Sequence, residues 1–124
     1  MRISKNFTRD EASCNCSCDQ DGADIQLVKW LEKIRKQYGK PVIIHCWNRC
    51  LKHNRTIKGS KDTSQHVKGK AVDFHIEGED PLDIACWIND NICPKSGGVG
   101  MYDTFVHMDR RAKKARWDMR SNHG

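Results

Sequence analysis

The six residues from Ala71 to Ile76 constrain the fold of this chain more than any other segment. After Ala71, apolar and polar residues alternate strictly along it, and the apolar ones are Val72, Phe74 and Ile76. Side chains of a strand point alternately to the two faces of a sheet. The pattern therefore predicts a half-buried strand whose polar face carries the Asp73 carboxylate and the His75 imidazole.

The flanking segments predict a mixture of helices and short strands. Apolar residues recur at three- and four-residue steps over 24–38, and Gly39 follows, which predicts an amphipathic helix with a glycine stop. The other predicted elements are a short buried strand over 41–45, a long loop over 48–69, a helix over 80–93, a turn over 97–100 and a strand over 104–109. This order predicts an α+β fold: a small antiparallel sheet packed with two to three helices.

Length and composition indicate one domain over residues 1–124. The chain has 124 residues, and we identify no internal repeat or low-complexity linker in it. We expect an irregular Cys-rich segment over 1–23, a basic tail over 110–124, and a monomer. No apolar run approaches the roughly 18 residues of a membrane-spanning helix. The first residues lack the apolar core of a secretion signal, so we expect synthesis in the cytoplasm without a signal peptide.

Charge and cysteine content leave several partners open. Lys and Arg exceed Asp and Glu by 22 − 16, a formal charge of +6. Such an excess suits nucleic acid, a membrane surface or an acidic polymer without selecting one. The seven cysteines could form disulfides, remain buried thiols or bind a second metal. Cys46 and Cys50 have the only clear metal-ligand spacing outside the N-terminal cluster.

A possible metal site comes from residues on both sides of a predicted bend. His66 lies in the long loop, Asp73 lies on the alternating strand, and Gly69 permits the bend between them. Histidine and aspartate both bind zinc, and a catalytic zinc takes three protein ligands and leaves a fourth position to water. His107 on the last predicted strand is the candidate for the third ligand, and His75 is its best rival.

Asp109 shares a predicted strand face with His107, two residues away. It could orient the His107 ring or accept a proton as a general base, and the sequence leaves both roles open. Asp103 is the second candidate for the base, since it is expected on the same strand face.

Three motifs resemble the zinc D-Ala-D-Ala carboxypeptidase superfamily, which includes VanY-type carboxypeptidases, phage endolysin peptidases and the Hedgehog domain. The pattern Ser-x-His-x-x-Gly-x-Ala-x-Asp spans 64–73, and Gly-x-Gly-x-Tyr-x-x-Phe-Val-His-x-Asp spans 98–109. The segment 46–54 is similar to the family's Ser-Gly-Tyr-Arg-x-x-x-x-Asn. The short bacterial and phage branch is the most similar, because its last ligand motif is His-x-Asp.

The resemblance implies a role for each matching position. It implies zinc bound by His66, Asp73 and His107, and an Arg49 guanidinium that stabilises the oxyanion formed from a peptide carbonyl. The residues expected to contact substrate are Ser64, Gln65 and Asn54. Many members carry a glutamate as base three residues before the last histidine ligand, where this chain has Thr104. Asp109 is therefore the expected base, with Asp103 second.

The resemblance also implies a function. We expect a zinc-dependent peptidase that cuts an amide bond in peptidoglycan stem peptides, as a D-Ala-D-Ala carboxypeptidase or endopeptidase. Its site of action would be the cell wall, during phage lysis or as part of a virion. The alternative is a catalytically weak or inactive wall-binding module that keeps the zinc fold. A zinc protein that binds nucleic acid is disfavoured, because basic residues are spread along the chain and no finger spacing occurs.

Overall fold

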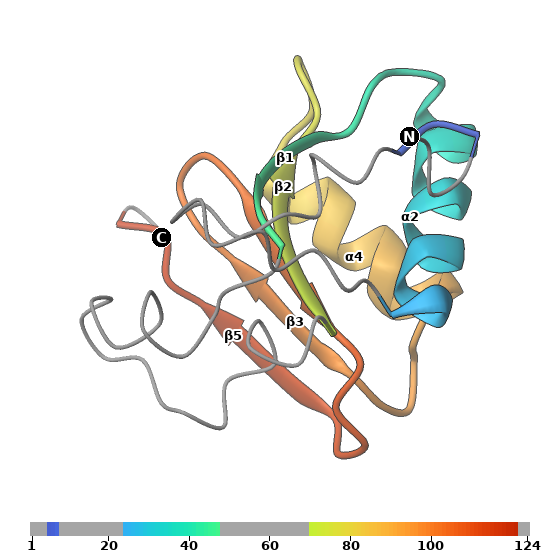
Figure 1. Cartoon of the computed structure of the whole chain (residues 1–124). Helices are drawn as coiled ribbons and strands as arrows, with labels where there is room; N and C mark the ends of the chain where they lie inside the picture. The colour runs from blue at the N-terminus through green and yellow to red at the C-terminus, as the bar shows by residue number, and fades with distance from the viewer. Residues whose placement is uncertain (1–4, 8–23, 48–69, 122–124) are drawn as a thin grey trace, which may run out of the picture.

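The computed structural model describes residues 5–7, 24–47 and 70–121. Its helices are α2 (Ile25–Tyr38) and α4 (Pro81–Asn91). Its strands are β1 (Ile43–Cys46), β2 (Ala71–His75), β3 (Gly98–Met101), β4 (Val106–Asp109) and β5 (Ala115–Asp118). Both helices lie on the same side of the sheet (Figure 1). The predicted α+β class is confirmed, and no helix in the described part is long and apolar enough to cross a membrane.

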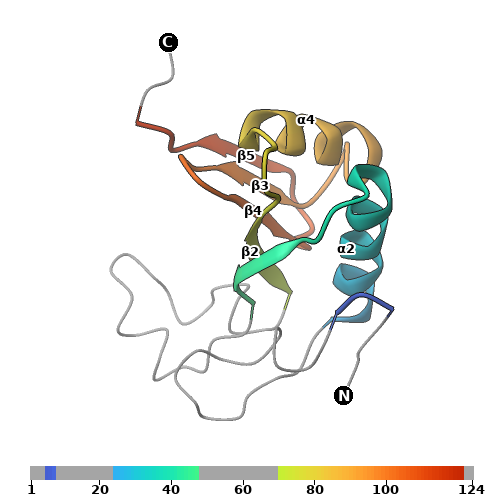
Figure 2. The same cartoon turned by 90° about the horizontal axis from the view of Figure 1, so that it is seen from above.

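The five strands form one sheet in the order β1-β2-β4-β3-β5. Neighbouring strands are antiparallel except β3 and β5, which run parallel, so the sheet is mixed and not wholly antiparallel as predicted. Strand β5 lies at the edge of the sheet, as the view from above also shows (Figure 2). Strand β5 lies within the segment 110–124, for which the sequence predicts only a basic tail. The sequence does not predict this strand, because four residues between charged neighbours show almost no strand periodicity.

Helix α2 begins and ends where the sequence predicts. The Asp24 carboxylate accepts a hydrogen bond from the Leu27 backbone N–H at 3.0 Å, so Asp24 is the N-cap. Gly39 closes the helix in the left-handed conformation with φ 65°, and its N–H donates to the Arg35 carbonyl. The buried face of the helix consists of Leu27, Val28, Leu31 and Ile34.

The hydrophobic core lies between this helix face and the helix-facing side of the sheet. Strands β2 and β4 contribute alternate residues to it, all fully buried: Val72, Phe74, Val106 and Met108. Since strand side chains alternate, the intervening residues Asp73, His75 and His107 point to the face turned away from the helices. That open face carries the candidate site.

Three local predictions are corrected. The strand predicted over 41–45 is β1, but it is an edge strand that is not buried; Ile43 is 42% exposed. The turn predicted over 97–100 is strand β3, which pairs with β4 and β5. The strand predicted over 104–109 begins only at Val106, because residues 103–104 lie in the turn after β3.

Glycine is required in β3 because two side chains cross it closely. A Cβ at Gly98 would lie 2.4 Å from Asp109 Oδ2, and one at Gly100 would lie 2.3 Å from Trp117 Cε2. A glycine pair resembles a turn when only local sequence is considered. Here the glycines leave space for larger neighbours on adjacent strands.

Candidate functional site

Strand pairing brings Asp73 and His107 together. The two residues are direct partners in the antiparallel register of β2 and β4. Their side chains meet on the open face, with 2.8 Å between His107 Nδ1 and Asp73 Oδ1. Two of the three predicted zinc ligands are therefore adjacent, although 34 residues separate them in sequence.

The other nitrogen of His107 contacts Asp109. His107 Nε2 lies 2.7 Å from Asp109 Oδ2, and both residues belong to β4. Only 9% of His107 is exposed and Asp109 is fully buried. Burial opposes a positive charge on His107, but its two carboxylate partners raise the pKa of the ring above the ordinary value.

Asp109 accepts hydrogen bonds from several donors besides His107. Its Oδ1 accepts from the backbone N–H groups of Gly98 and Arg111, both at 3.0 Å. The Arg111 guanidinium spans the carboxylate, with Nη2 2.7 Å from Oδ2 and Nε 2.9 Å from Oδ1. Burial would raise the pKa of Asp109, but the hydrogen bonds from His107 and Arg111 hold it well below its usual range.

One row of paired residues crosses the site-bearing part of the sheet. His107 pairs with Asp73 on one side and with Gly100 on the other, and Gly100 pairs with Trp117 on β5. Because Gly100 has no side chain, the Trp117 indole extends over it toward His107, with 5.1 Å between the ring centroids.

The Trp117 ring is held from two further directions. Its Nε1 donates to the Tyr102 hydroxyl at 3.0 Å, and the Arg111 guanidinium lies 5.2 Å from the ring centroid. Arg111 therefore contacts both Asp109 and Trp117. The sequence alone does not place Gly98, Arg111 or Trp117 at the site, since only sheet pairing and side-chain packing bring them to His107.

His75, the rival ligand, has other partners on the same face. Its Nδ1 lies 2.6 Å from His45 Nε2, and its Nε2 lies 2.9 Å from Glu77 Oε1. The His45 ring also packs against Phe105, with 5.4 Å between centroids. Burial, together with the charge of His75, lowers the pKa of His45 despite the opposing effect of Asp73. The two rings therefore contact each other, and His75 lies two residues after Asp73 on β2.

The donors around His107 fit a zinc ion in part. An imidazole nitrogen and a carboxylate oxygen converge, and a second carboxylate holds the far nitrogen of the imidazole, as is usual for zinc-binding histidines. Among the residues that the structure describes, no group of three or more His, Cys, Asp or Glu could hold a metal ion. The third predicted ligand, His66, lies outside the described residues, as do Arg49, Ser64, Gln65 and Asn54.

Asp103 does not lie on the strand face on which it was expected. It lies in the turn between β3 and β4, and its carboxylate accepts hydrogen bonds from the backbone N–H of Ser121 at 2.8 Å and from the hydroxyl of Ser121 at 2.9 Å. These bonds lower the pKa of Asp103. The placement was wrong because β4 starts only at Val106.

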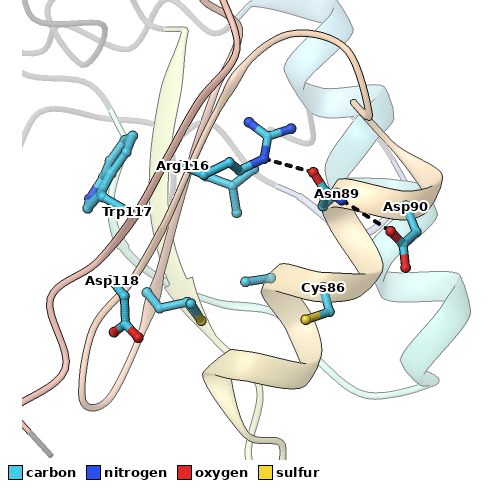
Figure 3. Close-up of a pocket in the computed structure, with 9 residues that line it drawn as sticks. Cys86, Asn89, Asp90, Arg116, Trp117 and Asp118 are labelled. Carbon is cyan, nitrogen blue, oxygen red and sulfur yellow. Dashed lines mark hydrogen bonds between the residues drawn. The ribbon is translucent and has the colours of Figure 1, made fainter. Parts of the chain in front are cut away.

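A cavity opens on the opposite, helix-facing side of the sheet, between α4 and strands β3 and β5 (Figure 3). Its volume is about 460 Å³. Arg116 points into this region, but its guanidinium binds Asn89 at 2.9 Å and the Gly97 carbonyl at 2.6 Å. Cys86 lies on its α4 side and carries a free thiol. The Arg116 contacts tie β5 to α4 and indicate a structural role for this guanidinium.

Comparison with known proteins identifies one family. The model of the family described as peptidase M15 matches residues 5–109. The match includes Asp73, His107 and Asp109 and ends immediately before the turn to β5. No curated protein and no solved structure matches the chain.

Proposed function

The chain belongs to the peptidase M15 family, and on this premise we propose that it is a zinc-dependent enzyme that hydrolyses an amide bond in peptidoglycan stem peptides. Members of the family are zinc-dependent peptidases. The observation that carries the proposal is the arrangement of His107 between two carboxylates. Asp109 holds Nε2, so that Nδ1 faces Asp73 at the position where a shared metal ion would bind.

In this proposal Asp73 and His107 bind zinc together with His66. When bound, zinc acts as a Lewis acid and lowers the pKa of a coordinated water to about 7. Arg49 would bind the carbonyl oxygen of the scissile amide as negative charge develops on it. Ser64, Gln65 and Asn54 would contact the peptide on either side. These roles of the loop residues rest on the motif resemblance.

We propose that Asp109 positions His107 and does not act as the general base. Both of its oxygens accept hydrogen bonds from Gly98, Arg111 and His107, and the residue is fully buried. A carboxylate enclosed in this way fixes the orientation and tautomer of the ring. Its side chain lies on the same face of the sheet as His107, but it is fully buried, and its oxygens are occupied by His107, Arg111 and Gly98.

The place of action is proposed from the resemblance to phage endolysin peptidases. The enzyme would act as a monomer on the cell wall, either during phage lysis or as part of a virion tail. Its partner would be the peptide of peptidoglycan.

Digestion of defined wall fragments tests the proposal. The full chain, loaded with zinc, is incubated with purified muropeptides and with a peptide ending in D-Ala-D-Ala, and the products are identified by mass spectrometry. We expect cleavage of one amide bond, loss of cleavage on chelation, and recovery on addition of zinc. Intact fragments after incubation with zinc-loaded protein would contradict the peptidase assignment.

The alternative is a wall-binding module without hydrolysis. It is favoured by Thr104, which stands where many members have a glutamate base and lies exposed in the turn before β4. Co-sedimentation with intact peptidoglycan, without release of peptides, would support this alternative.

A further inference from the structure

The surroundings of His75 repeat those of His107. In His107, Nε2 contacts the Asp109 carboxylate two residues later, and Nδ1 faces a possible metal ligand, Asp73 Oδ1, on the neighbouring strand. In His75, Nε2 contacts Glu77, also two residues later, and Nδ1 faces His45 Nε2 on β1. The same nitrogens are used in both cases, on the same face of the sheet.

This repetition has a chemical meaning. A carboxylate on the far nitrogen of an imidazole fixes its tautomer and aims the other nitrogen at a metal ion. At His75 the aimed nitrogen meets a second imidazole, which gives a pair of nitrogen donors. Imidazole pairs suit zinc, copper and nickel, whereas magnesium and calcium prefer oxygen donors.

We propose that His45 and His75 form a second metal-binding site, for a divalent transition metal such as zinc, with Glu77 as the residue that orients His75. The site goes beyond the proposed function, which needs one zinc ion at Asp73 and His107. Water would complete the coordination. His45 is exposed, and 28% of the His75 side chain is exposed, so an ion can reach both rings from solvent.

The geometry permits binding after a small movement. Two nitrogens on one tetrahedral zinc, each bonded at about 2.05 Å, lie about 3.3 Å apart, compared with 2.6 Å between His45 Nε2 and His75 Nδ1. Strand β1 can supply the difference, because it is an edge strand and its pairing with β2 is irregular between Ile44 and Cys46.

The two sites are separate. Asp73 and His75 are two residues apart on β2, which places their Cα atoms about 6.5–7 Å apart along the strand. His75 is directed toward β1, whereas Asp73 is directed toward His107 on β4. Because the two residues contact different partners, we expect each pair to hold its own ion, so that the protein would hold two neighbouring metal ions on the same face.

Metal titration of the full chain tests the proposal. Metal-free wild-type protein and the variants His45→Gln, His75→Gln and His107→Gln are titrated with zinc chloride in a calorimeter, under reducing conditions. Glutamine keeps a hydrogen-bonding side chain of similar length but is a poor zinc ligand. We expect His45→Gln and His75→Gln each to bind one zinc ion fewer than the wild type, while zinc at the Asp73–His107 site is retained. Glu77→Gln should weaken zinc binding at the His45–His75 site about 10–100-fold.

His107→Gln is the matched control for the other site. It should weaken zinc binding at the Asp73–His107 site and leave the zinc ion bound by His45 and His75. Comparison of each variant with the wild type separates this ion from any zinc held by the cysteines. If His45→Gln and His75→Gln, folded by circular dichroism, bind as much zinc as the wild type with the same affinities, the pair is only a hydrogen bond and the proposal is overturned. The peptidase assignment would survive that result, since it depends on the His107 site.

Discussion

At the scale of single residues, the surroundings of Asp109 decide how the site is organised. A buried carboxylate is costly unless it is fully hydrogen-bonded. Asp109 meets this condition through Gly98, Arg111 and His107. Because Arg111 neutralises it, the negative charge can remain buried beside His107 and hold the ring in one orientation.

Asp109→Asn separates a positioning role from a catalytic one. We expect zinc affinity to fall about 10–100-fold, measured by competition with a chelator, because the amide supports the His107 ring less well. At saturating zinc, kcat should then recover. A fall in kcat of about 10²-fold with unchanged zinc affinity would instead identify Asp109 as the base. Asp103→Asn is the control, since that carboxylate binds Ser121 and should change neither quantity.

Arg49→Lys tests the proposed oxyanion contact. A single positioned donor to a developing oxyanion contributes about 10²-fold or more to kcat, and lysine does not reproduce the geometry of a guanidinium. We expect kcat to fall by about that factor, while zinc content by mass spectrometry stays unchanged. Loss of zinc or of the folded state in this variant would show that Arg49 is structural.

At the scale of elements, the glycines of β3 let two neighbouring strands reach the site. Gly98 leaves room for the Asp109 carboxylate, and Gly100 leaves room for the Trp117 indole. Strand β5 follows the segment that the family model matches, yet it supplies the ring that flanks His107. Strand β5 therefore contributes a side chain to the surroundings of His107.

The contact of Gly100 with Trp117 predicts a strong coupling between two substitutions. Gly100→Ala should displace the indole and destabilise the protein, because its Cβ would lie 2.3 Å from Trp117 Cε2. In a Trp117→Ala background that clash is absent, so Gly100→Ala should cost less. We expect an interaction free energy of about 1–3 kcal/mol in a double-mutant cycle measured by urea unfolding.

Gly39→Ala provides the control for this cycle. Gly39 also disfavours alanine, because its φ is 65°, but nothing lies within 4 Å of the added Cβ. It should cost about 1 kcal/mol in either background. Additive effects of Gly100→Ala and Trp117→Ala would contradict the predicted contact.

At the scale of the whole molecule, one ion pair joins helix α2 to the end of β4. Asp24 caps α2 through the Leu27 N–H and also binds the guanidinium of Arg110, 86 residues later. Burial would raise the pKa of Asp24, but the hydrogen bonds from Arg110 and Leu27 and the positive charges of Arg110 and Lys70 bring it below its ordinary value. The helix layer and the sheet are thus linked electrostatically.

This ion pair predicts a dependence of stability on pH. Because the pKa of Asp24 is lower in the folded than in the unfolded state, its contribution is complete above about pH 4 and is lost as the pH falls through the folded pKa. Asp24→Asn keeps a capping side chain but removes the charge. We expect the free energy of unfolding to fall less steeply between pH 4 and pH 2 in this variant than in the wild type. Parallel curves would show that the pair does not stabilise the fold.

The sequence by itself determined the features that depend on local periodicity and on residue chemistry. Asp24 and Gly39 mark the ends of α2 because capping needs only neighbouring residues. The alternation over 71–76 placed Asp73 and His75 on one face because the period of a strand is two. The strand period and the chemistry of the side chains also identified His107 as a candidate zinc ligand and Asp109 as its neighbour on the same face.

Only the tertiary structure decided which of these side chains meet. The register of β2 against β4 placed Asp73 opposite His107, and the pairing of β1 with β2 turned His75 toward His45. The pairing of β3 with its neighbours made a strand of a glycine segment that reads as a turn. Such pairings join residues far apart in the chain, and a local pattern carries no information about its distant partner.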